Sequence, residues 1–241
     1  MDELRKGFHH ELDVLRDDVS RLAAMVIEAI PRATNVLLAQ DLDGANELIE
    51  DDDEIDAMTV EIEERCYRMI ALQAPVAGDL RQLVSILKMV GDIERSADLT
   101  VNICKAARRI YGHELGPRMR GIISRMSDQA QQLFTAALEA FQEKDDSKAA
   151  AIDDMDSFLD GLQRELVRTI LESRDDDEKI DLQVAIQMAM VARFYERIGD
   201  HAVNIGERVR YLVTGWLPEH KGAERFKRRD DTGGIPIIAP D

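Results

Sequence analysis

Apolar residues recur every three to four positions along most of this chain, and alternation of apolar and polar residues is nearly absent. A period near 3.6 predicts α-helices and argues against strands. Pro31 lies inside the first helical segment and predicts a kink there. Asp41 or Asp43 is expected to cap the second segment at its N-terminus. The pattern predicts an all-α protein with six long helices, at about residues 4–40, 42–73, 79–111, 118–143, 147–173 and 178–213.

Glycine and proline residues divide these helices into two groups of three. The middle of the chain is marked by residues 112–117, and Gly215 follows the sixth helix. Short connections place consecutive long helices antiparallel. The simplest architecture is therefore two tandem, homologous three-helix bundles, residues 1–112 and 113–214. The remainder, residues 215–241, combines a basic run with glycines and prolines and predicts a flexible tail.

One short segment occurs twice in the chain. Residues 94–103 read ERSADLTVNI and residues 196–205 read ERIGDHAVNI, with six of the ten positions identical. An offset of about 100 residues indicates duplication of half the chain and not a solenoid. A duplicated helix needs to keep only its apolar period, so the retained glutamate, aspartate and asparagine indicate a function beyond folding.

The repeated acids lie on the apolar face of their helices. At about 100° per residue, Val101 lies within about 20° of Glu94, and Asp98 lies about 40° away. Glu196 and Asp200 take the same places in the second copy. These four carboxylates are therefore expected to lie near the core and not on the solvent face.

A second acidic pair recurs on the preceding helix of each copy. Asp52 and Asp56 are four residues apart, as are Asp156 and Asp160, and both pairs lean toward the core. With 48 acids in 241 residues, roughly nine such pairs are expected by frequency alone. The prediction of a site therefore depends on the duplication of these pairs and on their position along the apolar stripe. Two adjacent helices would then bring four carboxylates together in each half.

Carboxylates that converge in a partly buried place repel each other, so they are protonated, paired with basic groups or bound to cations. Arg95 and Arg197 could pair with them, but both lie about 100° from the glutamate. An oxygen-rich metal site for Mg, Ca, Mn or carboxylate-bridged iron is the favoured interpretation. Asn102 and Asn204 could add an amide oxygen or make core hydrogen bonds. His201 lies about 140° away, which places it outside the ligand shell or on the surface.

Composition narrows the class of protein further. The net charge of −17, from 48 acids and 31 bases, argues against a nucleic-acid partner and against adhesion to an anionic membrane. No uninterrupted apolar run approaches the roughly 18–20 residues of a membrane span, and the acidic start lacks a signal-peptide pattern. Cys66 and Cys104 are unclustered, so free thiols in a reducing cytoplasm are expected, with a disulfide as the alternative.

No catalytic constellation emerges from the sequence. It lacks a Ser–His–Asp or Cys–His signature, a phosphate-binding glycine loop and a Glu-x-x-His motif. Asp79 and Asp181 are expected to cap helices and not to bind metal. We therefore expect no enzymatic activity. A metal-dependent hydrolase stays open as an alternative, because clustered metals can activate water.

At residues 94–103 and 196–205 the chain resembles the PhoU family of phosphate-signalling regulators. The second copy is close to the family pattern, whereas the first carries Ser96 and Ala97 where Ile-Gly is usual. The Asp-Leu-Arg triplet that begins at Asp79 and the acidic pairs of the preceding helices also fit. The resemblance covers about residues 3–214.

The resemblance implies a cytoplasmic regulator of phosphate transport and homeostasis that represses the phosphate-starvation response. It implies an adaptor between a phosphate ABC transporter, through its ATPase subunit, and a sensor histidine kinase. We expect a homodimer that meets the membrane only through these partners. An accessory protein of another anion transporter is the alternative. The family binds metal clusters, often iron or zinc, and the ligands carried over are Asp52, Asp56, Glu94 and Asp98 for one cluster and Asp156, Asp160, Glu196 and Asp200 for the other.

Overall fold

The computed structural model describes residues 2–173 and 180–216, with side chains from residue 5 onward. These residues form helices and no strand, so the all-α prediction is confirmed. The sixth helix begins at Leu182, so the predicted start at Glu178 is wrong, because residues 180 and 181 are not helical. Glu178 itself and the predicted tail beyond Trp216 lie outside the described residues. The helices are α1 (Asp2–Ala39), α2 (Leu42–Gln73), α3 (Ala77–Arg109), α4 (Pro117–Glu143), α5 (Asp146–Glu172) and α6 (Leu182–Thr214).

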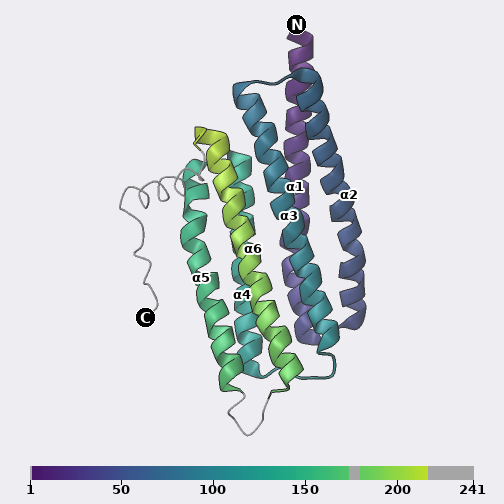
Figure 1. Cartoon of the computed structure of the whole chain (residues 1–241), viewed down its shortest axis with the longest axis vertical. Helices are drawn as coiled ribbons and strands as arrows, with labels where there is room; N and C mark the ends of the chain where they lie inside the picture. The colour runs from purple at the N-terminus through teal and green to yellow at the C-terminus, as the bar shows by residue number, and fades with distance from the viewer. Residues whose placement is uncertain (1, 174–179, 217–241) are drawn as a thin grey trace, which may run out of the picture.

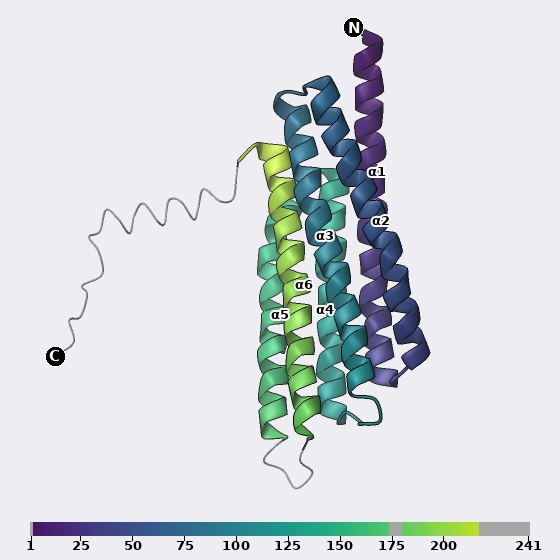
Figure 2. The same ribbon diagram turned by 45° about the vertical axis from the view of Figure 1, so that its right-hand side comes forward.

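Four of the six helices form a closed ring. Around it, α1 packs on α3, α3 on α6, α6 on α4 and α4 on α1 (Figures 1 and 2). The remaining two lie outside the ring, α2 against α1 and α3, and α5 against α4 and α6. The apolar side chains of both halves make one continuous core. The predicted pair of three-helix bundles is therefore present as two halves, and the division of the chain at residue 112 stays a prediction.

The helix termini follow local sequence signals. Asp41 caps α2 by accepting a hydrogen bond from the backbone N–H of Gly44 at 3.0 Å. Asp181 caps α6 in the same manner. Gly215 ends α6 with a φ of 75°, in the left-handed region that glycine adopts without steric cost. The predicted capping roles of Asp41 and Asp181 and the predicted end of the sixth helix before Gly215 are confirmed.

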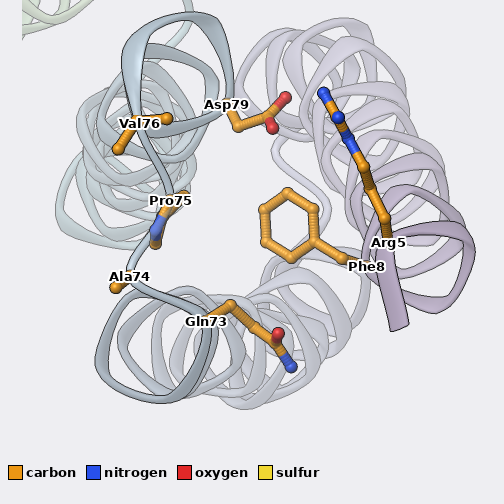
Figure 3. Close-up of a pocket in the computed structure, with 7 residues that line it drawn as sticks. All are labelled: Arg5, Phe8, Gln73, Ala74, Pro75, Val76 and Asp79. Atoms are coloured by element: carbon orange, nitrogen blue, oxygen red, sulfur yellow. The ribbon is translucent and has the colours of Figure 1, made fainter. Parts of the chain in front are cut away.

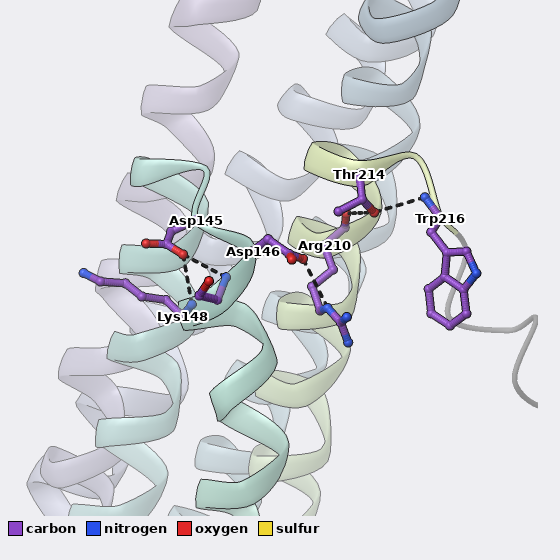
Figure 4. Close-up of polar contacts among 7 residues, drawn as sticks. Asp145, Asp146, Lys148, Arg210, Thr214 and Trp216 are labelled. Atoms are coloured by element: carbon purple, nitrogen blue, oxygen red, sulfur yellow. Dashed lines mark hydrogen bonds and ion pairs between the residues drawn. The ribbon is translucent and has the colours of Figure 1, made fainter.

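The start of α5 and the end of α6 lie side by side (Figure 4). The Asp145 carboxylate accepts backbone hydrogen bonds from Ser147 and Lys148, at 2.8 and 3.0 Å, and so caps α5. Arg210 of α6 reaches Asp146 at 3.3 Å. Because α5 and α6 run antiparallel, this ion pair joins the first turn of α5 to the last turns of α6 at one end of the second half.

Asp79 is not a helix cap, contrary to expectation. Its helix α3 begins two residues earlier, with Val76 in the capping position, so Asp79 lies in the first turn. Figure 3 shows its carboxylate facing Arg5 beside the ring of Phe8, at the end of the bundle where α1 passes the loop between α2 and α3. The turn residues before the helix, and not an aspartate, set where it starts.

Pro31 lies within α1, which continues through it to Ala39. Proline has no backbone N–H, so the carbonyl of Ile27, four residues earlier, loses its helical donor. The side-chain amide of Gln131 on α4 donates to this carbonyl at 3.2 Å. A contact between the two halves therefore satisfies the backbone group that the proline exposes.

A buried cluster of hydroxyl groups joins three helices at the centre of the ring. Tyr195 of α6 is fully buried, and its hydroxyl lies 2.6 Å from that of Thr34 on α1. The Ser127 hydroxyl of α4 lies 2.7 Å from the same Thr34 oxygen. Buried hydroxyls are costly unless they are hydrogen-bonded. The cluster therefore favours one alignment of the two halves.

One helix among the described residues meets the length and composition of a membrane span. It is the segment Arg5–Ala39 of α1. It was not identified from the sequence, because polar residues interrupt its apolar run. Half of its apolar window is buried inside the bundle. The core helix of a multi-helix bundle meets the same criterion, because its apolar residues face its neighbours.

Both cysteines are buried free thiols, as expected. Cys66 lies on α2 and Cys104 on α3. Burial is the main cause that raises the pKa of each thiol to about 12. Neither side chain is therefore a thiolate near neutral pH, so both act as small core residues.

The hydroxyl cluster predicts that Tyr195→Phe lowers the free energy of unfolding by about 1 kcal/mol, because a buried hydrogen bond is lost while the ring still packs. Urea unfolding followed by circular dichroism measures the change. Tyr67→Phe is the matched control, since the Tyr67 side chain is exposed, and it should leave stability unchanged. Equal stability of the two variants would contradict a structural role for the cluster.

Candidate metal centres

The first set of predicted acids comes together between α2 and α3. The carboxyl of Asp52 has its pKa raised from 3.8 to about 6, chiefly by burial and then by the charges of Asp56, Asp98 and Glu94. Burial, followed by Asp98 and Asp56, also raises the pKa of Glu94. Asp52 and Glu94 are half-buried, whereas Asp56 and Asp98 are exposed. The expectation that the repeated acids avoid the solvent face is therefore wrong for Asp98 and for Asp200, which is also exposed, because these aspartates lie at the edge of the apolar stripe. The four carboxylates therefore lie within electrostatic reach of one another.

The second set repeats this arrangement between α5 and α6. The pKa of Asp156 is raised from 3.8 to about 6, with burial as the largest cause. Neighbouring carboxylates contribute the rest: Asp160, Asp200, Glu196 and Asp153. Sequence reasoning missed Asp153. It lies one turn before Asp156, so an i, i+3 search on the same helix face could have found it.

A recess of about 420 Å³ opens at the second cluster. Asp156 lines it, and its Oδ1 is buried without a hydrogen-bond partner; so is Oε2 of Glu196, which is not a lining residue. Buried carboxylate oxygens without donors are unfavourable, and a bound cation is one partner that can satisfy them. The donor set therefore fits a hard or borderline cation. The residues that line the recess are Asp153, Asp156, Arg197, Asp200, His201, Val203 and Asn204.

The acids are neighbours without forming a finished ligand set. Among residues 2–173 and 180–216, no group of three or more His, Cys, Asp or Glu side chains is positioned to hold an ion. Side chains would have to turn toward a cation to coordinate it. The assignment of the eight carboxylates as metal ligands stays a prediction.

The salt-bridge alternative accounts for only one of the eight acids. Among these eight acids, all of which the structure describes, Glu196 alone makes an ion pair, and its partner is Arg193, one turn earlier. Arg95 instead lies 3.6 Å from the Asp92 carboxylate, with more than half of its side chain exposed. Arg197 lines the recess of the second cluster. The other seven acids make no ion pair among the described residues, and Lys105 near Asp52 and Arg95 near Glu94 offset only part of the repulsion.

His201 is buried between the two halves and not on the surface. Its Nδ1 lies 2.9 Å from Oδ1 of Asp92 on α3, and the Asn204 amide donates to the same oxygen at 3.3 Å. The expectation of a surface position for His201 is wrong. The angle of His201 around its helix places it away from the core of its own half, but that side of α6 packs on α3. The missed residue is Asp92; an acid among Met89, Val90 and Ile93 is a signal of burial.

Gly199 leaves room for the acid of the neighbouring helix. A Cβ at this position would collide with Oδ1 of Asp156 and would lie 2.7 Å from a methyl group of Leu159. The glycine of the second copy therefore lets α5 and α6 approach where their acids meet. The first copy carries Ala97, which is buried, so the two clusters differ in local packing.

The raised pKa values predict how stability depends on pH in the metal-free protein. The carboxyls of Asp52 and Asp156 titrate near pH 6 in the folded state and near 3.8 in the unfolded chain. The folded state thus binds more protons between these values, and stability falls as pH rises through about 6. Thermal melts in chelator should show an Asp52→Asn, Asp156→Asn variant with a weaker decline from pH 5 to 7.5 than the wild type.

The control for this experiment is Asp53→Asn, which removes the same kind of charge from an exposed position of α2. It should keep the wild-type pH dependence, because an exposed carboxylate is screened by water. If the control flattens the decline as much as the double variant does, overall charge and not the clusters sets the effect.

Gly199→Ala should lower the free energy of unfolding by about 1–3 kcal/mol, since the added methyl overpacks the contact with Asp156 and Leu159. Gly121→Ala on α4 is the matched control, because nothing lies within 4 Å of a Cβ there. Alanine should stabilise that exposed helical position by about 0.4–1 kcal/mol. Denaturant unfolding measures both. A stabilising Gly199→Ala would rule out the close approach.

Comparisons with known proteins agree with this architecture. The PhoU domain model matches residues 19–107 and 123–209, which contain the repeated segment once each. The "Phosphate-specific transport system accessory protein PhoU homolog 1" of Mycobacterium tuberculosis is 33% identical over 216 residues, covering 89% of this chain and 96% of the relative. The Aquifex aeolicus protein "Phosphate-specific transport system accessory protein PhoU homolog" is 37% identical over 212 residues, covering 88% and 95%.

A solved structure shows the same fold. The crystal structure of PhoU from Pseudomonas aeruginosa superposes with a TM-score of 0.81 at 31% identity, covering 87% of this chain and 100% of that one. The duplicated acidic helices, the two domain matches and this similarity lead to one conclusion: the chain belongs to the PhoU family.

Proposed function

We propose that this protein is an accessory regulator of phosphate transport that binds cations at two carboxylate clusters. The observation that carries the cation binding is the pair of repeated clusters with carboxyls whose pKa is about 6. The transport role is supported by relatives whose names describe accessory proteins of a phosphate-specific transport system. The match covers almost the whole length of each relative, so it is not confined to one part of those proteins.

The regulatory part of the proposal is an adaptor function. The protein docks through helix faces on the ATPase subunit of a phosphate ABC transporter and on a sensor histidine kinase. In this role it is a cytoplasmic, non-enzymatic homodimer that represses the phosphate-starvation response and meets the membrane only through its partners. The long exposed helices of the bundle offer extended surfaces for such docking (Figure 2).

Bound cations would supply positive charge between the paired helices. Asp52 and Asp56 of α2 would hold one cluster with Glu94 and Asp98 of α3. In the second half, the residues are Asp156, Asp160, Glu196 and Asp200. Carboxylates that repel each other in the metal-free protein would then attract a common cation, which fixes α2 on α3 and α5 on α6. Iron, zinc, magnesium, manganese and calcium are the candidate ions.

Metal analysis tests the cation sites. The wild type should retain bound cation after dialysis against Zn²⁺, Mn²⁺ or Fe²⁺, and its melting temperature should rise because the ion binds the folded state. Glu94→Gln with Glu196→Gln should lose most of the metal and of the thermal shift. Glu61→Gln, at an exposed position of α2, serves as the control. Equal metal content in the double variant and the wild type would show that these ligands are wrong.

Partner capture tests the adaptor function separately. The tagged protein should retain both the transporter ATPase subunit and the kinase from a lysate of its source, and the carboxylate variant should retain less of at least one. Glu61→Gln again provides the control for nonspecific charge effects. If neither partner is captured in the metal-free or the metal-loaded state, the adaptor role is overturned even when metal binds.

A further inference from the structure

We propose that Nε2 of His201 is a nitrogen ligand of the second cluster, so that the two halves of the protein select different cations. The inference rests on the proposed cation binding. It adds a ligand of a different chemical type, and it assigns Asp92 of the first half as the residue that positions the ring.

The nitrogen in question is buried and has no partner. The His201 side chain is 9% exposed, and its Nε2 makes no hydrogen bond. Buried polar atoms in folded proteins almost always have a partner, so an unpaired ring nitrogen calls for an explanation. A bound cation would explain the unpaired nitrogen and also the carboxylates gathered beside it.

The other ring nitrogen is held in the manner typical of metal-binding histidines. Nδ1 of His201 lies 2.9 Å from the Asp92 carboxylate, which accepts a hydrogen bond and so places the ring proton on Nδ1. The lone pair then remains on Nε2. Metal-bound histidines usually donate their second N–H to a carboxylate, which orients the ring and raises its basicity.

The ring and the acids of the second cluster share one recess. His201 lines it together with Asp153, Asp156 and Asp200. Oδ1 of Asp156 is a second buried acceptor without a hydrogen-bond donor. The two residues that carry these unpaired acceptors, a ring nitrogen and a carboxylate oxygen, therefore line the same recess. A cation can satisfy both, and the negative charge of the acids attracts it, whereas an anionic ligand would be repelled.

The first cluster has no corresponding nitrogen. Leu99 stands where the second copy has His201, and Phe194 stands where the first has Asp92. The first cluster therefore offers carboxylate oxygens, which suit hard cations such as Mg²⁺, Ca²⁺ and Mn²⁺. An added imidazole shifts the preference of the second toward Zn²⁺ and Fe²⁺.

The histidine side-chain resonances of the full chain, labelled with ¹⁵N, test the assignment. Titration with Zn²⁺ should move the Nε2 resonance of His201 strongly, because a bound metal withdraws its lone pair, and Mg²⁺ should leave it in place. The resonance is identified by replacing the other four histidines in turn. The exposed His113 is the internal control and should not respond at equal Zn²⁺ concentration.

Affinities provide the second readout. In a background with the first cluster removed by Glu94→Gln and Asp98→Asn, His201→Gln should weaken Zn²⁺ binding about 10- to 100-fold, and Asp92→Asn should weaken it less. Mg²⁺ affinity should stay the same in both variants. His113→Gln provides the matched control. Circular dichroism melts verify that each variant is folded.

The outcomes separate this inference from the proposed function. If the wild type binds no cation, both are overturned. If Zn²⁺ binds in a manner that depends on Asp156 and Glu196, while the Nε2 resonance stays in place and His201→Gln binds equally well, only the nitrogen ligand is overturned. The titration of the wild type decides the question even if His201→Gln fails to fold.

Discussion

Repulsion among half-buried carboxylates is balanced in this protein by one continuous apolar core. Each half places acids of two neighbouring helices side by side, and burial together with like charge raises the pKa of Asp52 and of Asp156 to about 6. Acids held in this way oppose folding near neutral pH. The ring of α1, α3, α6 and α4, with α2 and α5 packed against it, is what keeps the acidic helices together without a cation. The bundle therefore holds together two clusters of carboxylates that repel each other.

The two halves are copies with different chemistry. At the second cluster Gly199 admits Asp156 to a tight contact, and His201 lines the recess. The first copy has Ala97 and Leu99 in these places. The contact between Asp92 and His201 also joins the halves, because these residues lie on α3 and α6. A structural link between the first half and the second cluster therefore exists beside the apolar core.

Much of this could be predicted from the sequence, because the governing physics is local. The apolar period of 3.6 located the helices, and the capping residue Asp41 located the start of α2. The duplicated acids also shared the phase of the apolar stripe, so their convergence within each half followed from helix geometry. Asp79 departs from expectation since a helix start depends on the turn before it as well as on its aspartate.

The sequence by itself determined the fold class, the repeat and the eight acids of the two clusters, because each depends on spacing along one helix or between adjacent helices. Only the tertiary structure decided how the halves meet. The burial of His201 against Asp92, the support that Gln131 gives to the carbonyl exposed by Pro31, and the hydroxyl cluster around Tyr195 all join segments far apart in the chain. The spacing of residues gives the direction of each side chain around its own helix axis. It does not say which other helix lies in that direction. The partners of buried polar groups at the contact between the halves therefore became visible only when all six helices were packed.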